Sequence, residues 1–275
     1  MNSEKESAKV VFITGASCGI GKSTAAHLAA RGYVVYGTSR HPESCSETKN
    51  VTLIKMDVRD TDSVKEAVAH IAAKEGHLDV LINNAGFGIG GAIEDTPTQM
   101  VQALFDTNFF GVYRVLQEVL PIMKQQTNGL IINMSSIGGM IGLPYQGIYS
   151  ASKFAVEGLS EALYKELSST GINVVLVEPG DFKTGFTANR QNINTKNGAN
   201  AFQRSLDVIE RDEQRGQHPI KIARLIEKII TASRPRLRYA VGPFDQTSVL
   251  FLKRILPDRW FDRIIMSYYK LRTAE

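Results

Sequence analysis

Tyr149 and Lys153, four positions apart, are the pair of residues in this sequence best suited to acid–base chemistry. On a helix, residues at i and i+4 lie on the same face, so the phenol and the ammonium group would be neighbours. A fixed cation beside a phenol favours the phenolate and lowers the phenol pKa from about 10 toward neutral pH. Ser136 would then hold the substrate oxygen that gains or loses the proton. The same spacing is common where a half-buried aromatic residue packs beside a solvated lysine, so the pair alone does not decide the function.

A glycine-rich segment near the start of the chain has the composition of a phosphate-binding loop. The apolar run 10–13 predicts a buried strand, and the apolar spacing after residue 21 predicts a helix. Between them, Gly15, Gly19 and Gly21 permit a tight turn and a close approach of the backbone to a ligand. The free N–H groups at the start of the helix would favour a phosphate or pyrophosphate there. Glycines at a turn are often only a turn, and this spacing differs from G-x-G-x-x-G.

The residues after the second predicted strand, 33–37, indicate which dinucleotide the loop would bind. At this point a carboxylate bonds the ribose hydroxyls of NAD, whereas an arginine nearby accepts the 2′-phosphate of NADP. The sequence here is Thr38, Ser39 and Arg40, without an acidic residue. We therefore expect NADP(H), with Arg40 as the phosphate ligand, although such an arginine can also be an ordinary surface residue.

Strands and helices alternate along the chain as far as residue 180. Apolar runs predict strands at 51–54, 80–82, 130–132 and 172–177, and amphipathic spacing predicts helices over 61–75 and 97–126. Such alternation predicts an α/β fold with a doubly wound parallel sheet, helices on both faces and three αβα layers. Ligands bind beyond the carboxyl ends of such strands, where all the candidate motifs fall. Asn108, inside the second helix, is an interior amide that can be structural or functional.

The composition is that of an ordinary globular chain: 275 residues, 43% hydrophobic, 22% charged, with a net charge of +4. We expect a single domain over 1–275, because no Pro/Gly/Ser-rich linker divides the chain. The Lys and Arg residues are scattered, which does not indicate a nucleic-acid surface. The two cysteines, Cys18 and Cys45, provide neither a disulfide framework nor a metal site. No secretory signal or transmembrane span is expected, so we predict a cytoplasmic protein without a metal.

Taken together, these motifs resemble the short-chain dehydrogenase/reductase family over about residues 9–184. They are T-G-x3-G-x-G at 14–21, N-N-A-G at 83–86, Asn108, Ser136, Tyr149-x3-Lys153 and P-G-x3-T at 179–184, in family order. The family's catalytic serine usually lies 13 residues before the tyrosine, and 149 − 13 = 136 selects Ser136 over Ser135. The resemblance implies an NAD(P)-dependent alcohol/carbonyl oxidoreductase with a Rossmann-like sheet of about seven strands.

The resemblance also implies a role for each matching residue. Tyr149 would be the general acid/base, and Lys153 would lower its pKa and bond the nicotinamide ribose. Ser136 would position the substrate carbonyl, and Asn108 would support a proton relay through water. Contacts to NADP would come from Gly15, Ser17, Gly19, Ile20, Gly21, Thr38, Ser39, Arg40, Asp57, Val58, Asn84, Ala85, Gly86, Tyr149, Lys153, Pro179, Gly180, Phe182 and Thr184.

Two residues depart from the family pattern. Cys18 precedes Gly19 where many NADP-preferring members carry a base, so the phosphate would rely on Ser39 and Arg40. Asp181 stands where an apolar residue often follows Pro-Gly, which leaves the pocket wall at that point undecided.

Substrate specificity is expected after residue 180. The cofactor-binding and catalytic core would span 9–180, a mobile lid 181–218, and an apolar helical tail 243–275. This pattern resembles the family branch that acts on steroids, retinoids and other lipid-like alcohols and ketones. After Pro257, the pairs Trp260/Phe261, Ile264/Ile265 and Tyr268/Tyr269 recur at helical spacing. This stripe would pack on the domain or a second subunit, cover the pocket, or lie on an acidic membrane.

Two other functions fit part of the sequence. A nucleotide-sugar epimerase also uses Tyr-x3-Lys, but its glycine spacing differs and its second domain would lengthen the chain. An NADPH-binding sensor without turnover would need only the cofactor contacts, and not Asn108, Ser136, Tyr149 and Lys153 together. We therefore predict an enzyme acting on a small apolar alcohol or ketone, as a homodimer or homotetramer.

Overall fold

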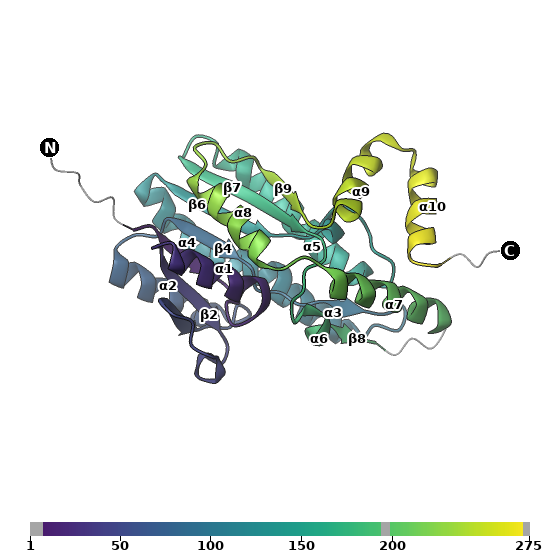
Figure 1. The fold of residues 1–275 in the computed structure, drawn as a ribbon. Helices are drawn as coiled ribbons and strands as arrows, with labels where there is room; N and C mark the ends of the chain where they lie inside the picture. Colours follow the sequence, from purple (N-terminus) through teal and green to yellow (C-terminus); the bar gives the residue numbers. More distant parts are fainter. Residues whose placement is uncertain (1–7, 194–198, 272–275) are drawn as a thin grey trace.

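The computed structural model describes residues 8–193 and 199–271, and its centre is one parallel sheet of seven strands (Figure 1). The strand order is β3-β2-β1-β4-β6-β7-β9, and each neighbouring pair is parallel. The strands are β1 (Val10–Ile13), β2 (Val34–Ser39), β3 (Val51–Lys55), β4 (Val80–Asn83), β6 (Gly129–Met134), β7 (Ile172–Pro179) and β9 (Arg238–Val241). The order reverses direction between β1 and β4, which is the point where doubly wound sheets bind ligands.

Helices cover both faces of this sheet. They are α1 (Gly19–Ala30), α2 (Thr61–Glu75), α3 (Thr98–Phe105), α4 (Gly111–Gln126), α5 (Gly147–Glu166), α6 (Phe186–Asn189), α7 (Ala199–Arg215), α8 (Ile220–Thr231), α9 (Phe244–Ile255) and α10 (Asp258–Tyr268). One core cluster joins the strands to α2, α4 and α5, and another joins them to α1 and α8. The predicted Rossmann-like three-layer fold is confirmed.

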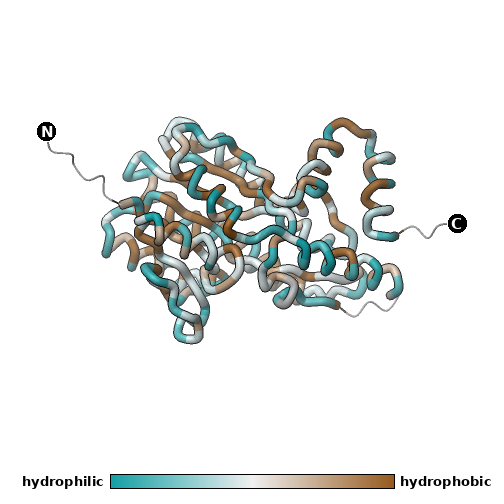
Figure 2. The backbone as a smooth tube through the Cα atoms, in the orientation of Figure 1, coloured by the Kyte–Doolittle hydropathy of each residue, from teal (hydrophilic) through white to brown (hydrophobic). Residues whose placement is uncertain are grey.

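Strand β1 shows why the sequence reads as a continuous apolar run. Val10 and Phe12 belong to the core beneath α2, α4 and α5, whereas Val11 and Ile13 belong to the core beneath α1 and α8. Successive side chains of a strand point to opposite faces, so a sheet covered on both sides needs apolar residues at every position. The hydrophobic strands accordingly run through the middle of the molecule between more polar helices (Figure 2).

Helix α2 begins and ends where the sequence predicts. The Asp60 carboxylate accepts from the N–H groups of Asp62 and Ser63, which makes Asp60 the N-cap. The helix ends at Gly76, whose φ of 74° is in the left-handed region.

The predicted helix over 97–126 is interrupted by a π-helical turn. It consists of α3, a π-helical segment (Asp106–Phe110) and α4, in direct succession. A π-turn inserts one residue into the helical repeat and is common at functional sites. Here it contains Asn108, the amide that the sequence analysis identified.

The segments after β7 build one end of the molecule. Strand β8 (Gln191–Asn192) pairs with β5 (Ile89–Gly90) beside α6, and α7 follows at the same end. After β9, α9 and α10 form a helical hairpin that projects beyond the sheet on the side of α7 (Figure 1). Across 8–193 and 199–271, every helix is too short or too polar to span a bilayer.

Candidate active site

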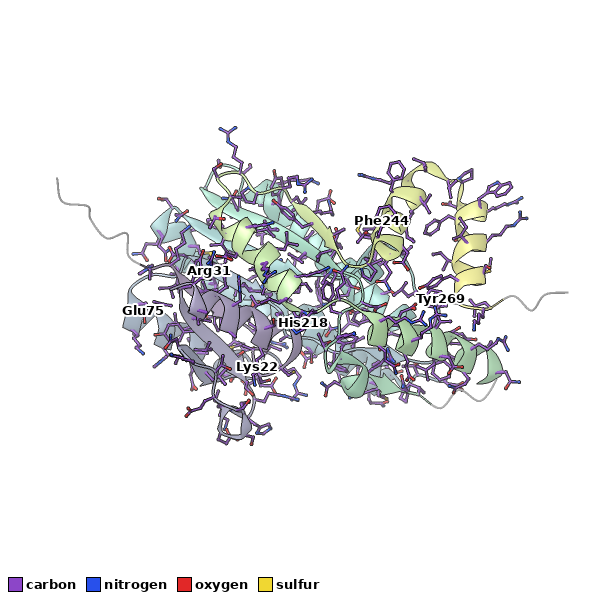
Figure 3. All side chains as sticks on the ribbon, viewed as in Figure 1. Lys22, Arg31, Glu75, His218, Phe244 and Tyr269 are labelled. Carbon is purple, nitrogen blue, oxygen red and sulfur yellow. The ribbon has the colours of Figure 1, made fainter. Side chains whose placement is uncertain are left out.

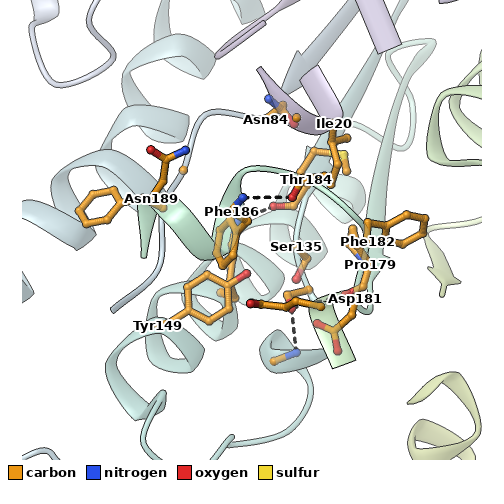
Figure 4. Close-up of a pocket in the computed structure, with 18 of the residues that line it drawn as sticks. Ile20, Asn84, Ser135, Tyr149, Pro179, Asp181, Phe182, Thr184, Phe186 and Asn189 are labelled. Atoms are coloured by element: carbon orange, nitrogen blue, oxygen red, sulfur yellow. Dashed lines mark hydrogen bonds between the residues drawn. The ribbon is translucent and has the colours of Figure 1, made fainter. Parts of the chain in front are cut away.

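A cavity of about 1020 Å³ opens at the carboxyl-terminal edge of the sheet. Its walls come from the loops after β1, β2, β4, β6 and β7, and from helices α5, α7, α9 and α10. Figure 4 shows part of this wall, with Tyr149, Ser135, Asp181, Phe186 and Asn84 around one space. The sequence placed its candidate motifs at this edge, and the structure brings nearly all of them into this single cavity.

The loop after β1 has a backbone that only glycine adopts readily. Gly15 and Gly19 have φ values of 67° and 55°, in the left-handed region. A Cβ on Gly21 would lie 2.2 Å from the Gly15 carbonyl oxygen and 2.5 Å from Asn84 Nδ2. The role of Gly21 is therefore close packing of the helix against the loop, and it does not line the cavity.

The start of α1 is open toward the cavity. Its N-cap residue, Cys18, makes no side-chain hydrogen bond to the first turn, and that turn contains no acidic residue. The first N–H groups of a helix need an acceptor, and they carry the positive end of the helix dipole. This helix start therefore offers its N–H groups to an anion in the cavity.

Thr38 at the end of β2 holds the glycine loop, and Ser39 orders the turn that follows the strand. Gly15 N donates to Thr38 Oγ1 at 3.2 Å, so the Thr38 hydroxyl holds the glycine loop in place. His41 N donates to Ser39 Oγ at 3.2 Å, which orders the turn that carries the exposed Arg40. Thr38, Ser39 and Arg40 all line the cavity.

Arg40 faces the carboxylate of Asp57 across this part of the cavity. The Arg59 guanidinium, which hydrogen-bonds both Asp57 oxygens, and at longer range the charge of Arg40 hold the Asp57 pKa below its usual range. Within 8–193 and 199–271, no carboxylate lies within ion-pair distance of Arg40. Its guanidinium is thus available to an anionic ligand at the cavity rim.

The two neighbouring serines after β6 differ in their surroundings. Ser136 Oγ accepts from Gly138 N at 3.0 Å and lies 3.5 Å from the Pro179 carbonyl oxygen, to which it donates. Its hydrogen bond with the Tyr149 hydroxyl lowers the phenol pKa. Ser135 Oγ is buried and has no hydrogen-bond partner in the described part of the chain. Ser136, the serine chosen from the spacing, is the one beside Tyr149.

Tyr149 and Lys153 lie on one face of α5, as predicted, but their electrostatics differ from the prediction. Burial raises the pKa of Tyr149 to about 12, and the hydrogen bond with Ser136 opposes this rise only in part. Lys153 Nζ donates to the Met134 carbonyl at 2.8 Å and lies 5.9 Å from the centre of the Tyr149 ring. Burial lowers the pKa of Lys153 to about 8. The expected lowering of the phenol pKa by Lys153 is therefore wrong for this structure, because desolvation dominates.

Asn108 lies behind the cavity wall and not in it. Its Nδ2 donates to the Phe87 carbonyl at 3.0 Å and to Ser152 Oγ at 3.1 Å, and its Oδ1 accepts from Phe87 N at 3.1 Å. Ser152 Oγ in turn donates to the Tyr149 carbonyl at 2.7 Å. Asn108 thus joins the loop after β4 to the first turns of α5 and positions both, while its part in a proton relay stays a prediction.

The remaining predicted contacts surround the same cavity. Asn84 Nδ2 donates to the carbonyls of Thr14 and Gly15 at 3.0 and 2.9 Å, which fixes the loops after β1 and β4 to each other. Apart from Gly21 and Asn108, every predicted residue lines the cavity: Gly15, Ser17, Gly19, Ile20, Thr38, Ser39, Arg40, Asp57, Val58, Asn84, Ala85, Gly86, Ser136, Tyr149, Lys153, Pro179, Gly180, Phe182 and Thr184.

The structure adds wall residues that the sequence did not identify. They come from the segment after β7 and from α9, and include Phe186, Asp212, Glu213 and Gln246. The Phe186 ring meets the Tyr149 ring edge to face, with centroids 5.7 Å apart. The sequence predicted a lid over 181–218, but it does not say which side chains of that segment turn inward.

Helices α7 and α10 close the cavity from opposite sides. Ser205 Oγ donates to the Tyr269 carbonyl at 3.1 Å, and the Tyr268 hydroxyl hydrogen-bonds the Asp212 carboxylate. Figure 3 shows Tyr269 at the end of α10, beside α7. The segment predicted as a lid, 181–218, and the predicted tail therefore meet over the cavity; residues 194–198 of that segment lie outside the described residues.

The C-terminal stripe combines two of its three predicted roles. Phe261 is buried in a cluster with Ile137 and Ile141, while Ile265 packs against that cluster and lines the cavity. Trp260 is 61% exposed on the outer side of α10. The helix both packs on the domain and covers the cavity, and its contact with a membrane remains untested.

Comparisons with known proteins agree with this site. The family model described as short chain dehydrogenase matches residues 9–195. A 3-ketodihydrosphingosine reductase from Bacteroides thetaiotaomicron is 47% identical over 269 residues, which cover 96% of this chain and 99% of that protein.

Solved structures give the same result. A short-chain dehydrogenase from Streptomyces avermitilis superimposes with a TM-score of 0.83 at 31% identity, over 97% of each chain. ElxO with NADP bound superimposes with a TM-score of 0.71 at 29% identity, over 85% of this chain and 97% of its own. This chain therefore belongs to the short-chain dehydrogenase/reductase family of oxidoreductases, which act on C=O and CH–OH groups.

Proposed function

We propose that this protein is an NADP(H)-dependent oxidoreductase that interconverts a ketone and a secondary alcohol on a long-chain, lipid-like substrate. The observation that carries the proposal is the continuity of one cavity. It runs from Arg40 past Ser136, Tyr149 and Lys153 to the apolar side chains of α9 and α10. One end suits a dinucleotide, the middle holds the proton donor, and the far end suits an aliphatic chain.

The residues present fit a nicotinamide dinucleotide. The uncapped start of α1 and the loop around Gly15 and Gly19 suit a pyrophosphate, because they offer N–H groups without obstructing side chains. Arg40 and Ser39 stand where an NAD site would place a carboxylate, which favours NADP(H). The NADP-bound state of ElxO, at 29% identity, supports this choice.

When bound, the reduced nicotinamide supplies the hydride for the carbonyl carbon. Tyr149 is the proton donor: with a pKa near 12 its phenol is protonated at neutral pH, so it can give a proton to the developing alkoxide. Ser136 would hold the carbonyl oxygen beside that phenol, and Lys153 would bond the nicotinamide ribose. Asn108 acts indirectly. Its hydrogen bonds to Phe87 and Ser152 fix the loop after β4 and the first turns of α5, which carry Tyr149.

The substrate end of the cavity supports the choice of a lipid-like substrate. Ile209 of α7, Val249 and Leu252 of α9, and Ile264 and Ile265 of α10 line it. Apolar side chains of this kind accept an alkyl chain and exclude water from the reacting carbonyl. The name of the Bacteroides relative, a 3-ketodihydrosphingosine reductase, points to the same class, a ketone on a long alkyl chain.

We also propose that α7 acts as a lid and that the protein is a homo-oligomer. Phe110, Tyr113 and Tyr164 are 47%, 45% and 42% exposed on the π-turn, α4 and α5. Large apolar side chains gathered on adjacent helices mark contact surfaces. Light scattering of the purified protein measures the oligomeric state, and a monomer at micromolar concentration would refute the proposed homo-oligomer.

The test of function is consumption of NADPH with long-chain ketones. We expect loss of NADPH absorbance with 3-ketodihydrosphingosine and with other ketones on a long alkyl chain, and much slower consumption with a short ketone such as butanone. Chromatography of the product should show the secondary alcohol. The absence of turnover with every long-chain ketone, in a protein that still binds NADPH, would favour the sensor function instead.

A further inference from the structure

Asp181 is a carboxylate on the wall of the cavity that holds Tyr149. Asp181 lies two residues after Pro179, whose carbonyl accepts the hydrogen bond from Ser136 Oγ. The Asp181 side chain therefore starts from a position in the backbone close to Ser136. Burial and the Ser136 hydrogen bond have larger effects on the pKa of the Tyr149 phenol, and the charge of Asp181 raises that pKa further. Asp181 is therefore near the reacting groups and not at the rim.

A glutamine from the C-terminal hairpin fixes the position of Asp181. Gln246 Oε1 accepts from Asp181 N at 2.8 Å, and Gln246 Nε2 donates to Asp181 Oδ2 at 2.5 Å. The other carboxylate oxygen, Oδ1, accepts no hydrogen bond from residues 8–193 or 199–271. One oxygen of a positioned carboxylate is thus left for a ligand.

The neighbouring carboxylates already have cationic or hydrogen-bonding partners. Glu213 pairs with Arg190 Nη1 at 2.7 Å, and Asp212 pairs with Arg211 Nη2 at 3.0 Å. Asp181 has no cation within ion-pair distance among the described residues, although the charge of Arg190 reaches it. Of these three carboxylates, Asp181 alone has no cationic partner within ion-pair distance in the described part of the chain.

We propose that Asp181 is a specificity-determining residue that binds an ammonium group next to the reacting carbonyl, so that the substrates are long-chain amino ketones. This inference rests on the proposed function and adds the substrate's charge to it. An ammonium ion would give the Asp181 carboxylate a cationic partner, and its N–H groups suit the free Oδ1. An apolar tail on the same molecule would lie against α9 and α10.

The protonation of Asp181 agrees with this assignment. Burial raises its pKa to about 7, with the hydrogen bond from Gln246 opposing the rise. A cation beside the carboxylate favours the ionised form and returns the pKa toward its usual range. The same cation offsets the effect of Asp181 on Tyr149, which makes the phenol a stronger proton donor.

The test uses two matched ketones with wild-type protein. One is 3-ketodihydrosphingosine, which carries an amino group next to its carbonyl. The other has the same chain with a hydroxyl in place of that amino group. We expect wild-type kcat/KM to be about tenfold to a hundredfold higher for the amino ketone, the range of a charge-assisted hydrogen bond.

Asp181→Asn is the informative variant, because it removes the charge and keeps the size of the side chain. We expect it to abolish the preference for the amino ketone, mainly through a higher KM for that ketone, while NADPH affinity changes little. Turnover of the hydroxy ketone should not fall, because the variant loses a charge that raises the Tyr149 pKa. Asp181→Glu should restore part of the preference. Asp262→Asn, which removes an exposed charge from α10 outside the cavity lining, is the matched control and should retain the preference.

The outcomes separate this inference from the proposed function. Equal wild-type turnover of the two ketones, or an unchanged preference in Asp181→Asn, would overturn the role of Asp181 and leave the ketone reductase standing. No turnover of either ketone would overturn both. If Asp181→Asn does not fold, inhibition of the wild type decides: a long-chain amine must inhibit more strongly than the alcohol of equal length.

Discussion

At the scale of single residues, opposing effects set the pKa of Tyr149. Burial and the charges of Asp181 and Glu213 favour the neutral phenol, and the hydrogen bond with Ser136 favours the phenolate. A neutral phenol suits reduction, in which the enzyme must give a proton to the substrate oxygen. A phenolate is the form that accepts a proton in oxidation, so the two directions should have different pH dependences.

Tyr149→Phe should remove nearly all turnover and leave NADPH binding intact. Only the hydroxyl is lost, and the ring still packs edge to face against Phe186. General acid catalysis typically contributes about 10²–10⁴-fold, so kcat should fall by at least that range. Steady-state kinetics and NADPH fluorescence titration provide the two measurements.

The adjacent serines supply a matched control for the same experiment. Ser136→Ala should reduce kcat/KM severely, because Ser136 Oγ is the hydroxyl beside the phenol. Ser135→Ala should have a mild effect, because its buried Oγ has no partner to lose in the described chain. A more severe effect of Ser135→Ala would show that the two serines have been assigned the wrong way round.

Arg40 carries the prediction of cofactor preference. Arg40→Ala should weaken NADPH binding by about tenfold to a hundredfold, the range of a charge-assisted contact to phosphate, and leave NADH binding unchanged. Titration of both cofactors into wild type and variant measures the difference. Tighter binding of NADH than of NADPH by the wild type would contradict the preference.

At the scale of elements, Arg238 attaches the edge strand β9 to the rest of the fold. Its guanidinium donates to Glu157 at 3.0 Å and Glu161 at 2.9 Å on α5, and lies 3.5 Å from Glu178 on β7. Glu157 and Glu178 are buried, whereas the Glu161 side chain is 44% exposed. One cation thus compensates two buried carboxylates at the end of the sheet from which the hairpin departs.

Arg238→Gln should destabilise the protein by about 1–3 kcal/mol, the cost of buried acceptors left without their donor. Glu161→Gln is the matched control: it removes an exposed partner of the same guanidinium and should cost less than about 1 kcal/mol. Urea unfolding of both variants measures the difference. Equal effects would indicate that the buried carboxylates are not what Arg238 stabilises.

Removal of residues 257–275 tests the hairpin as a wall of the cavity. NADPH binding should change little, because the loops after β1 and β2 are held by the sheet and by Thr38 and Asn84, not by α10. Turnover of long-chain ketones should fall more than that of short ones, because Ile264, Ile265 and Tyr268 line the substrate end. Equal loss for both substrates would refute a role in the pocket, and loss of binding to anionic vesicles would favour membrane contact.

At the scale of the whole molecule, Glu178 makes stability depend on pH. Burial raises its pKa to about 7, and the charge of Glu157 acts in the same direction. A carboxyl with a higher pKa in the folded than in the unfolded chain stabilises the fold below about pH 4, and this contribution is lost as the pH rises through about 7. We expect the Tm to fall from about pH 5 to about pH 8, and Glu178→Gln to flatten the decrease. An identical pH dependence in this variant would exclude Glu178 as its source.

The sequence predicted the parts of the molecule whose signals are local. Six strands are mainly apolar segments, and those in the middle of the sheet are apolar because both faces are covered. The glycine loop and Tyr149-x3-Lys153 are contiguous motifs. Strand β9 was not located, because Arg238–Val241 is a short edge strand with half-exposed side chains. Asp212, Glu213 and Gln246 reach the cavity only through the tertiary approach of α7 and α9, which leaves no periodic signal. The predicted lowering of the Tyr149 pKa was wrong, because the spacing of residues in a sequence does not show how deeply the phenol is buried.

The cavity is made by two unlike kinds of structure. Loops at the carboxyl-terminal edge of the sheet line one end of it, and helices α7, α9 and α10 line the other. Changes confined to these three helices leave the seven strands in place, together with α8, which packs on the sheet. We therefore predict that exchanging α7 and the residues after β9 for the same segments of a relative transfers that relative's choice of ketone and preserves nucleotide binding.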